Sequence, residues 1–193
     1  ELLPGQAVTI QGLILHLSAG MTPVREALRR LIAEGALEAQ GNRRISVPRL
    51  TRANVDELIF ARQAIDPKLV FMATSNITKA NMAALTAEDE ALDRAIVAGN
   101  IPGYLQHNYR FHTMLYDIAD APILRSVALR MWLQFGPSLR VVCGRVGTQN
   151  LVDEHKEVLA AMAEGDAERA AAAIRADVLQ GMEQVRRTFD VSD

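Results

Sequence analysis

The chain has 193 residues, of which 49% are hydrophobic and 23% are charged, so it can bury a core and is not intrinsically disordered. Its net charge of −2 at pH 7 excludes a generally basic protein, and binding to nucleic acid would require a local basic patch. The one cysteine, Cys143, fits a reducing compartment, and the lack of a membrane-length apolar run or a signal-peptide pattern predicts a soluble, cytoplasmic protein.

The first predicted element is a helix that follows Thr9 and extends to Leu17, with apolar residues at helical spacing. Thr9 can cap this helix, because its hydroxyl can accept a hydrogen bond from a backbone N–H of the first turn. Residues 18–21 form a short turn, and a second helix follows, with Thr22 as its expected cap and Pro23 as its expected first residue. A helix, a tight turn and a basic helix in this order are typical of a helix-turn-helix.

The second helix, in the segment MTPVREALRRL, is basic and amphipathic. Its apolar residues share one face, and the opposite face carries Thr22, Arg25 and Arg29. Such a face suits the major groove of DNA, although a charged helix face is more often only solvated. We also expect Glu26 to pair with Arg30, one turn further along the helix.

A β-hairpin is predicted directly after these helices. Residues 36–40 and 43–47 each show the period of two that is typical of a strand, and Gly41-Asn42 between them is a turn signal. Arg43 and Arg44 lie beside the tip of this hairpin. A hairpin can lie on the surface without a binding role. Directly after a helix-turn-helix, however, it is better interpreted as a wing that contacts phosphates or the minor groove.

The rest of the chain, from Thr51 onward, is predicted to be helical almost throughout. The expected fold is therefore mainly α, with a winged helix-turn-helix DNA-binding domain at residues 1–49 and an all-α helical bundle at residues 50–193. Residues 137–149 have no clear assignment, and Gly144 to Gly147 supply a break. The predicted helices are 51–75 (bent or broken at Pro67), 78–98, 101–119, 122–136, 150–164 and 166–188, the last capped by Asp166.

Four polar side chains lie within the apolar stripes of the bundle helices. Asn108 and His112 share the third predicted helix of the bundle, His155 lies on the fifth and Asp177 on the last. Buried polar groups need hydrogen-bonding partners, and a buried carboxylate needs a cation or several donors. Two interpretations follow: the four groups hydrogen-bond one another and water around a pocket, or they hold a divalent metal.

The most specific motifs of the chain are Leu3-Pro-Gly5 with Leu13 and Leu17, Thr22 to Leu31, Glu34-Gly35, Phe111-His112, Glu154-His155 and Gly165-Asp166. Together they resemble the FadR-like branch of the GntR family of transcriptional regulators, over nearly the whole chain. In that family, the stretch similar to TPVREALRRL is the recognition helix of a winged-helix DNA-binding domain. The resemblance implies that the C-terminal helical bundle is an FCD domain, which binds a small effector and often a metal.

Three departures from the family pattern matter. The family has a helix before the Leu-Pro-Gly loop, and we expect this first helix of the DNA-binding domain to be missing here. Gly20-Met21 stands where the family usually has Ser-Arg, so a common DNA-contacting arginine is lost. Asn108 and Asp177 stand where the family has Asp and His, whereas His112 and His155 match its metal ligands.

The resemblance implies a metal site at these four residues. Two imidazoles, a carboxylate and an amide oxygen can bind a divalent ion such as Zn²⁺, Ni²⁺ or Mn²⁺, although the amide is a weaker ligand than the carboxylate it replaces. A metal with open coordination positions suits a small anionic effector, typically a carboxylate. Arg62 and Arg140 are candidates to hold the other end of that effector, or they are ordinary structural ion-pair partners.

We therefore predict a ligand-responsive, DNA-binding transcriptional regulator rather than an enzyme. A homodimer would place two winged helices on a double-stranded operator, with Thr22, Arg25 and Arg29 facing the DNA and Arg43 and Arg44 adding phosphate contacts. An effector in the bundle would change the relative placement of these heads. Two alternatives remain: a metabolite- or metal-binding module that has lost DNA binding, and a metal-dependent hydrolase, against which stands the lack of an HExxH motif.

Overall fold

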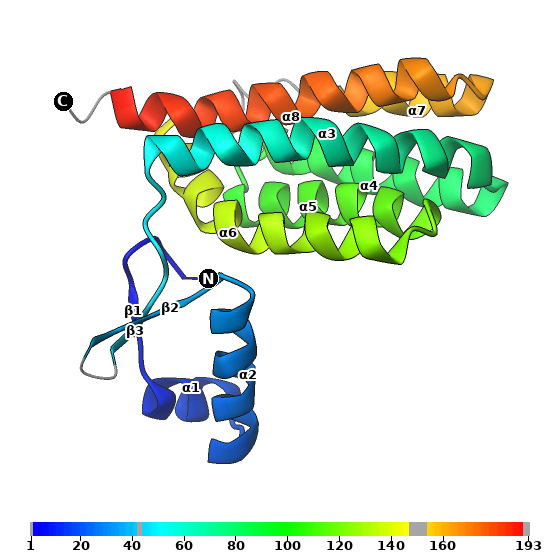
Figure 1. The fold of residues 1–193 in the computed structure, drawn as a ribbon. Helices are drawn as coiled ribbons and strands as arrows, with labels where there is room; N and C mark the ends of the chain where they lie inside the picture. Colours follow the sequence, from blue (N-terminus) through cyan, green and yellow to red (C-terminus); the bar gives the residue numbers. More distant parts are fainter. Residues whose placement is uncertain (1, 42–43, 147–153, 191–193) are drawn as a thin grey trace.

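The computed structural model describes residues 2–41, 44–146 and 154–190, and these form two units (Figure 1). The first unit contains two short helices and three strands, and the second is a bundle of longer helices. Each unit has its own cluster of buried hydrophobic residues. The predicted fold class, a winged helix-turn-helix followed by a helical bundle, is confirmed.

The helix-turn-helix consists of α1 (Ile10–Leu17) and α2 (Met21–Ala33). Thr9 caps α1 as predicted, since its Oγ1 accepts a hydrogen bond from the backbone N–H of Gly12 at 3.0 Å. The apolar face of α2 turns inward, so its polar face is left for solvent or a partner. The buried hydrophobic residues of this unit are Val8, Val24, Leu28, Leu37 and Val47.

The start of α2 differs from the prediction. The helix begins at Met21 with Gly20 as its N-cap, so Thr22 is not the cap and Pro23 is the third helical residue rather than the first. Gly20 makes no side-chain cap, and its backbone is extended, with φ −71° and ψ 161°. Proline is tolerated anywhere in the first turn, because the N–H groups there have no intrahelical acceptor. The Thr-Pro pair therefore marks the helix start only to within two residues.

The wing is the antiparallel hairpin of β2 (Glu38–Gln40) and β3 (Arg44–Ser46), which confirms the predicted hairpin with shorter strands. Arg43 lies outside the described residues. A third strand, β1 (Ala7–Val8), pairs antiparallel with the other side of β3 and was not predicted. Two residues are too few to show the alternation that identifies a strand in a sequence.

The bundle is built from α3 (Arg52–Asn76), α4 (Lys79–Val97), α5 (Ile101–Ile118), α6 (Pro122–Val146), α7 (His155–Glu164) and α8 (Ala167–Asp190). α3 packs lengthwise against α8, α4 against α5, and α7 against α8 (Figure 1). Asp166 caps α8 as predicted, accepting a hydrogen bond from the backbone N–H of Arg169 at 3.0 Å. Within the described ranges, no helix combines the length and the apolar character needed to cross a membrane.

Two helices run through prolines where the sequence predicted interruptions. α3 continues past Pro67, and α6 continues past Pro137 and through Gly144 to Val146, in a region that had no assignment. An internal proline costs about 3 kcal/mol of helix stability, but each apolar side chain buried in the following turns contributes about 1.5–3 kcal/mol. The buried side chains that follow the two prolines are Leu69, Val70, Ala73, Leu139, Val142 and Cys143.

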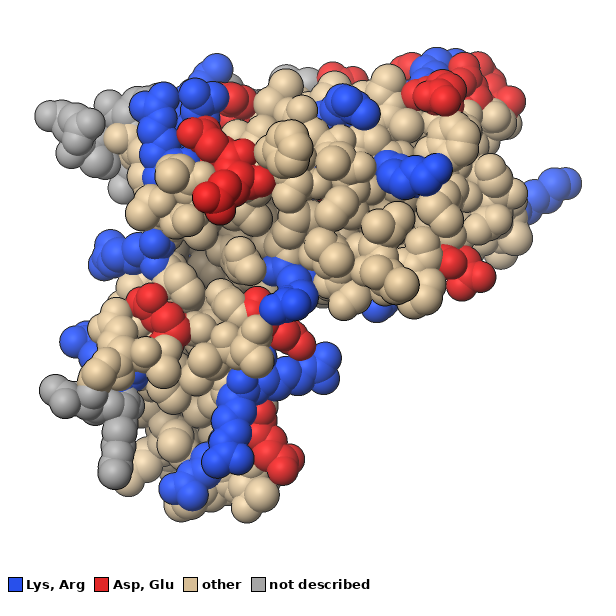
Figure 2. Space-filling view, viewed as in Figure 1, with Lys and Arg blue, Asp and Glu red and all other residues tan. Residues whose placement is uncertain are grey.

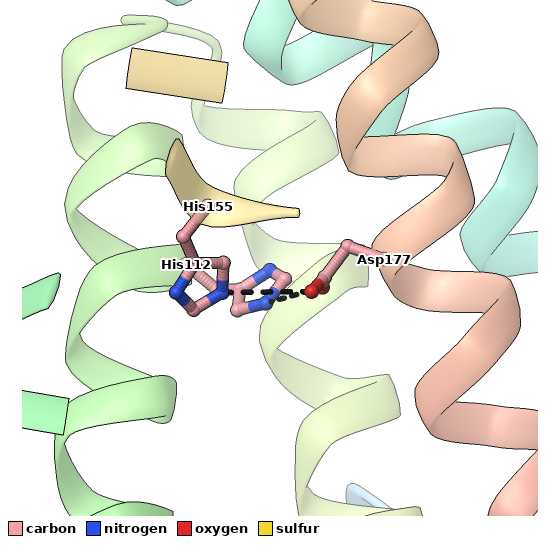
Figure 3. Close-up of side chains that lie close together, drawn as sticks. All are labelled: His112, His155 and Asp177. Carbon is pink, nitrogen blue, oxygen red and sulfur yellow. Dashed lines mark ion pairs between the residues drawn. The ribbon is translucent and has the colours of Figure 1, made fainter. Parts of the chain in front are cut away.

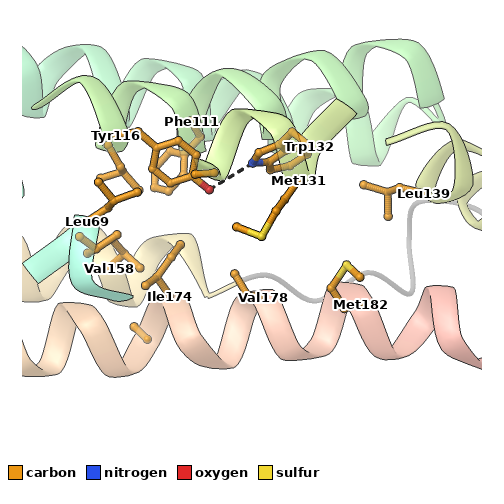
Figure 4. Packing of buried hydrophobic residues seen from close by; sticks show 14 of the residues in the cluster. Leu69, Phe111, Tyr116, Met131, Trp132, Leu139, Val158, Ile174, Val178 and Met182 are labelled. Carbon is orange, nitrogen blue, oxygen red and sulfur yellow. Dashed lines mark hydrogen bonds between the residues drawn. The ribbon is translucent and has the colours of Figure 1, made fainter. Parts of the chain in front are cut away.

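Aromatic rings of α5 and α6 form one side of the bundle core, facing aliphatic side chains of α3, α7 and α8 (Figure 4). The indole Nε1–H of Trp132 donates a hydrogen bond to the hydroxyl of Tyr116 at 3.1 Å. This bond gives the buried indole N–H a partner and fixes the orientation of the Trp132 ring. The hydrogen bond therefore holds the rings of Trp132 and Tyr116 in one arrangement.

α6 also contacts the winged helix. Nη2 of Arg130 donates a hydrogen bond to the carbonyl of Ala33, the last residue of α2, at 3.0 Å. The side chain of Gln134, one turn further along α6, lies against Gly35, whose φ of 77° favours glycine. The C-terminal end of α2 is thus held by the same stretch of α6 that contains Trp132.

Cys143 should react very slowly with the thiol reagent DTNB in the native protein. Its thiol is buried in α6, and burial raises its pKa to about 11. At pH 8 only about one thiol in a thousand is then the reactive thiolate, compared with about a quarter at the ordinary pKa of about 8.5. We expect the native rate to be at least about 100-fold below the rate in urea-unfolded protein. A native rate within tenfold of the unfolded rate would contradict this buried environment.

Candidate functional site

Three side chains from three helices meet inside the bundle (Figure 3). His112 comes from α5, His155 is the first residue of α7, and Asp177 comes from α8. Oδ2 of Asp177 is 3.1 Å from Nε2 of His112, and Oδ1 is 3.7 Å from Nε2 of His155. One ligand atom of each residue lies within 4.8 Å of the others. We call these three residues the His–Asp cluster.

Burial and neighbouring groups set the protonation states in the His–Asp cluster. Burial lowers the pKa of His112 and favours the neutral imidazole, although the adjacent Asp177 opposes this effect. Burial alone would raise the pKa of Asp177, but His155, the hydrogen bond with His112 and the more distant Arg62 outweigh it and hold that pKa well below its usual range. A carboxylate beside a neutral imidazole is the form in which both groups bind metals.

The first turn of α7 provides a further partner for Asp177. The backbone N–H of Glu154, the residue before α7, donates a hydrogen bond to Oδ1 of Asp177 at 3.4 Å. The carboxylate therefore lies at the N-terminal end of a helix, where the exposed N–H groups favour a negative charge. This contact links the position of the carboxylate to the start of α7.

His155 is held on two sides. Its ring stacks on Phe111, with centroids 3.9 Å apart, and its Nδ1 lies 3.5 Å from Oδ1 of Asp89 on α4. Asp89 is itself buried and also lies 3.5 Å from Nζ of Lys156. A carboxylate beside one ring nitrogen of a histidine orients the ring, and here it directs Nε2 of His155 toward Asp177.

Asp89 was not identified from the sequence, although a signal was present. It occupies the apolar stripe of its helix between Leu85 and Leu92, both of which are fully buried. The spacing i, i+4, i+7 is the same pattern that identified His112 and His155. Burial would raise the pKa of Asp89, but His155 and Lys156 outweigh it, so that pKa is lowered.

Asn108 lies beside the cluster on the same face of α5 as His112, one turn earlier. Asn108, His112 and Asp177 line one small pocket, together with Arg62 of α3. The cavity volume is about 30 Å³, enough for one or two water molecules. Three of the four residues predicted as metal ligands thus form the His–Asp cluster, and the fourth, Asn108, lines the same small pocket as His112 and Asp177.

Arg62 forms a buried ion pair, the structural role that the sequence offered as the alternative to holding an effector. Its Nε and Nη2 both donate to Oδ2 of Asp66, at 2.9 Å and 2.7 Å. Its guanidinium also lies over the rings of Trp132 and Phe135, 4.8 Å and 4.4 Å from their centroids. Burial alone would lower the pKa of Arg62, but the carboxylate of Asp66 outweighs it and raises that pKa. Arg62 is thus a fixed positive charge in the wall of the small pocket.

Arg140, the other predicted effector residue, lies at a different cavity. This second pocket, between α5 and α6, has a volume of about 310 Å³ and is lined mainly by apolar side chains. Trp132 and Leu139 line both pockets. The structure therefore places Arg62 and Arg140 at two adjacent pockets rather than at one.

The remaining histidines lie outside the cluster. Nδ1 of His107 is 2.7 Å from Oε2 of Glu88, in a partly exposed pair between α5 and α4. His16 is exposed on α1. His107 lies five positions before His112 on the same helix and offers a matched control for it.

The candidate DNA-binding residues within the described ranges are all exposed: Thr22, Arg25, Arg29 and Arg44. Basic side chains follow α2 along one side of the winged helix (Figure 2). The predicted pairing of Arg30 is wrong: its Nε lies 2.8 Å from Oε1 of Glu34 at the C-terminal end of the helix. Glu26 and Glu34 are each one turn from Arg30, so helical spacing alone does not distinguish them.

The chain is similar to known proteins both in sequence and in structure. Residues 57–180 match the FCD domain. The HTH-type transcriptional regulator McbR of Escherichia coli K12 is 28% identical over 170 residues, covering 86% of this chain and 77% of McbR. The solved structure of E. coli McbR/YncC has a TM-score of 0.91 at 25% identity, covering 97% of this chain and 90% of that one. A GntR transcriptional regulator from Rhodococcus sp. RHA1 shares the fold, with a TM-score of 0.75 at 17% identity over 95% of this chain and 88% of its own.

The stability of the metal-free protein should decrease as the pH falls below about 6.5. The unfolded chain then binds a proton at His112 that the folded chain, with its lowered pKa, does not bind. The free energy of unfolding should decrease by up to about 1.4 kcal/mol per pH unit for this one proton. Urea unfolding between pH 5 and 7 in EDTA measures this slope. In His112→Gln the slope should be reduced, and equal slopes in His112→Gln and His107→Gln would contradict the assignment.

Proposed function

The chain is a GntR-family transcriptional regulator with an FCD domain, and we propose that a small anionic ligand in its helical bundle controls how tightly its winged helix binds an operator. The observation that carries this proposal is that α6 lines both pockets of the bundle and also contacts the end of α2. An effector that binds one arrangement of this contact better than another changes DNA affinity by that difference in free energy.

In this proposal, residues 1–49 bind DNA and residues 50–193 bind the effector. α2 is the recognition helix, because its polar face is exposed while its apolar face anchors it to the unit. Its side chains would contact base edges and nearby phosphates, and the wing would contact the backbone of the adjacent groove. The residues assigned to DNA are Thr22, Arg25 and Arg29 on α2, and Arg43 and Arg44 on the wing.

Two copies of the chain would bind one operator as a homodimer in the cytoplasm. A helix-turn-helix contacts only a few base pairs, and two of them related by a two-fold axis double the contacts. The half-sites would then lie one helical turn, about 34 Å, or a multiple of it apart. A ligand that changes the separation of the two recognition helices would change their fit to both half-sites.

The His–Asp cluster is proposed to hold a divalent metal. Two donors about 2.1 Å from a tetrahedral zinc ion lie roughly 3.4 Å apart. Oδ2 of Asp177 lies 3.1 Å from Nε2 of His112, Oδ1 lies 3.7 Å from Nε2 of His155, and one ligand atom of each residue lies within 4.8 Å of the others. Zn²⁺, Ni²⁺ and Mn²⁺ all accept this donor set, and Asn108 is the candidate for a further oxygen ligand. When bound, the metal would supply a Lewis-acidic position for an anionic group of the effector.

The positive charges around the pockets favour a carboxylate as that anionic group. Arg62 presents a fixed guanidinium at the small pocket, and Arg140 lies at the neighbouring one. In this function the side chains bind and orient a ligand and take part in no reaction, so the protein is not an enzyme. Asp66 accepts two hydrogen bonds from Arg62, and these fix the position of the Arg62 guanidinium in the wall of the small pocket.

Arg25→Ala and Arg29→Ala should each weaken operator binding by about 1–3 kcal/mol, because each removes a charged contact to a base or a phosphate. A mobility-shift titration on the upstream region of the gene, at several salt concentrations, measures this. Arg94→Ala, an exposed arginine of α4 in the bundle, is the matched control and should bind as tightly as the wild type. If the wild type forms no sequence-specific complex, the DNA-binding part of the proposal is wrong.

His112→Ala should weaken zinc binding by at least about tenfold, because it removes one of the three close ligand donors. Calorimetric titration of Zn²⁺ into EDTA-stripped protein measures the affinity, and elemental analysis of purified protein gives the metal content. His107→Ala leaves the cluster intact and should bind zinc as the wild type does. Equal metal content in the two variants would remove the proposed site.

A further inference from the structure

The pocket between α5 and α6 is separate from the one beside the His–Asp cluster. Trp132 and Leu139 line both pockets and are almost fully buried, so these two side chains form a wall between them. The pocket between α5 and α6 has a volume of about 310 Å³, at the lower end of the range for small-molecule sites. It is therefore a candidate ligand site of its own.

This pocket extends from the surface to the core of the bundle. Leu2 and Tyr109 are 37% and 42% exposed, whereas Trp132 and Leu139 are 7% and 6% exposed. Gly136 leaves one side of the pocket open, because a Cβ at this position would meet no described atom within 4 Å. A small molecule thus has a path from solvent to the buried end of the pocket.

Two aromatic rings form a corner in the wall of this pocket. The rings of Tyr109 and Trp132 have centroids 5.4 Å apart and stand at 82° to each other. A flat ring placed in such a corner can stack on one ring and meet the other edge-on, and both arrangements are favourable for aromatic pairs. The Trp132 ring is held by its hydrogen bond to Tyr116, so this side of the corner is fixed before a ligand binds.

The rest of the wall favours an uncharged molecule. Its other side chains are aliphatic except for Arg140, the one charged group that lines this pocket among the described residues. Arg140 already takes part in an interaction within the chain. A charged ligand would lose its hydration against the aliphatic wall, and this loss costs free energy. The aliphatic residues and the glycine of the wall are Leu2, Leu105, Gly136, Pro137 and Leu139.

We propose that the pocket between α5 and α6 binds a small, uncharged aromatic molecule of one or two rings, in the corner between Tyr109 and Trp132. The site needs neither the metal nor the anionic effector of the proposed function. It also lies where the bundle meets the winged helix, since the segment that contains Leu2 runs between the two units (Figure 1). The backbone N–H of Gly5 in this segment donates a hydrogen bond to the carbonyl of Val47 at 2.8 Å. Ligand pockets occur preferentially at such junctions.

Fluorescence tests this proposal directly, because Trp132 is the one tryptophan of the chain. EDTA-treated protein is titrated with benzyl alcohol, with benzoate as its charged counterpart and with cyclohexylmethanol as its saturated counterpart. We expect saturable binding of benzyl alcohol with a dissociation constant of about 1 mM or below. Benzoate should bind at least about tenfold more weakly, because the wall does not replace its hydration. Benzyl alcohol should bind at least as tightly as the more hydrophobic cyclohexylmethanol, since contacts between aromatic rings add roughly two- to tenfold in affinity.

Tyr109→Leu removes one ring of the corner and keeps the pocket apolar. It should weaken the binding of benzyl alcohol by about threefold or more and change that of cyclohexylmethanol by less than about twofold. Because Tyr109 is 42% exposed, its replacement leaves the buried core unchanged. Phe60→Leu is the matched control, at an exposed aromatic residue of α3 that does not line this pocket, and should bind all three compounds as the wild type does.

Each contrary outcome removes a stated part of the proposal. The lack of a saturable change with benzyl alcohol, or an equal loss of affinity in Phe60→Leu and Tyr109→Leu, overturns the site. Benzoate binding as tightly as benzyl alcohol overturns the uncharged class. Tighter binding of cyclohexylmethanol, or equal weakening of both alcohols in Tyr109→Leu, overturns the aromatic class. The titrations contain neither metal nor DNA, so their failure leaves the proposed metal and operator binding standing, and the converse also holds.

Discussion

The largely buried carboxylate of Asp177 is the constraint on which the arrangement of the bundle depends. A charged group removed from water costs several kcal/mol unless donors or cations replace its hydration. Here α5 and α7 each provide an imidazole, and the start of α7 provides a backbone N–H. These partners reach Asp177 only when the three helices keep one register. The surrounding aliphatic core would tolerate several packings, so the polar centre selects one of them.

The ion pair of Arg62 and Asp66 acts in the same way on the packing of α3 against α6. It lies on α3, and the guanidinium of Arg62 covers Trp132 and Phe135 of α6. A cation over an aromatic face and a carboxylate on its edge define the position of α6 more closely than aliphatic contacts would. Since α6 also holds the end of α2, the two pockets of the bundle and the winged helix share one structural element.

The features that depend on local pattern were predictable from the sequence: the helix-turn-helix, the wing, the order of the bundle helices and the inward positions of Asn108, His112, His155 and Asp177. The start of α2, strand β1 and the passage of α3 and α6 through Pro67 and Pro137 were not, because tertiary packing outweighed the local signal there. Asp89 was missed for a different reason: its position follows from helical spacing, but its partner His155 lies on another helix, and only the fold brings the two together. Asp66 lies one turn after Arg62 on α3, so the spacing i, i+4 could have indicated that pair.

The contact of α2 with α6 lies at the C-terminal end of α2, which makes the winged helix a lever. Its 13 residues extend about 18 Å from Ala33, which Arg130 holds, to the N-terminal end that carries the candidate DNA-contacting residues. A rotation of about 5° at the attached end would move the far end by about 1.6 Å. Hydrogen bonds to base edges tolerate only about 0.5 Å of variation in length. In the proposed function, a displacement of α6 too small to disturb the bundle core would therefore be enough to move α2 out of register with the bases of an operator.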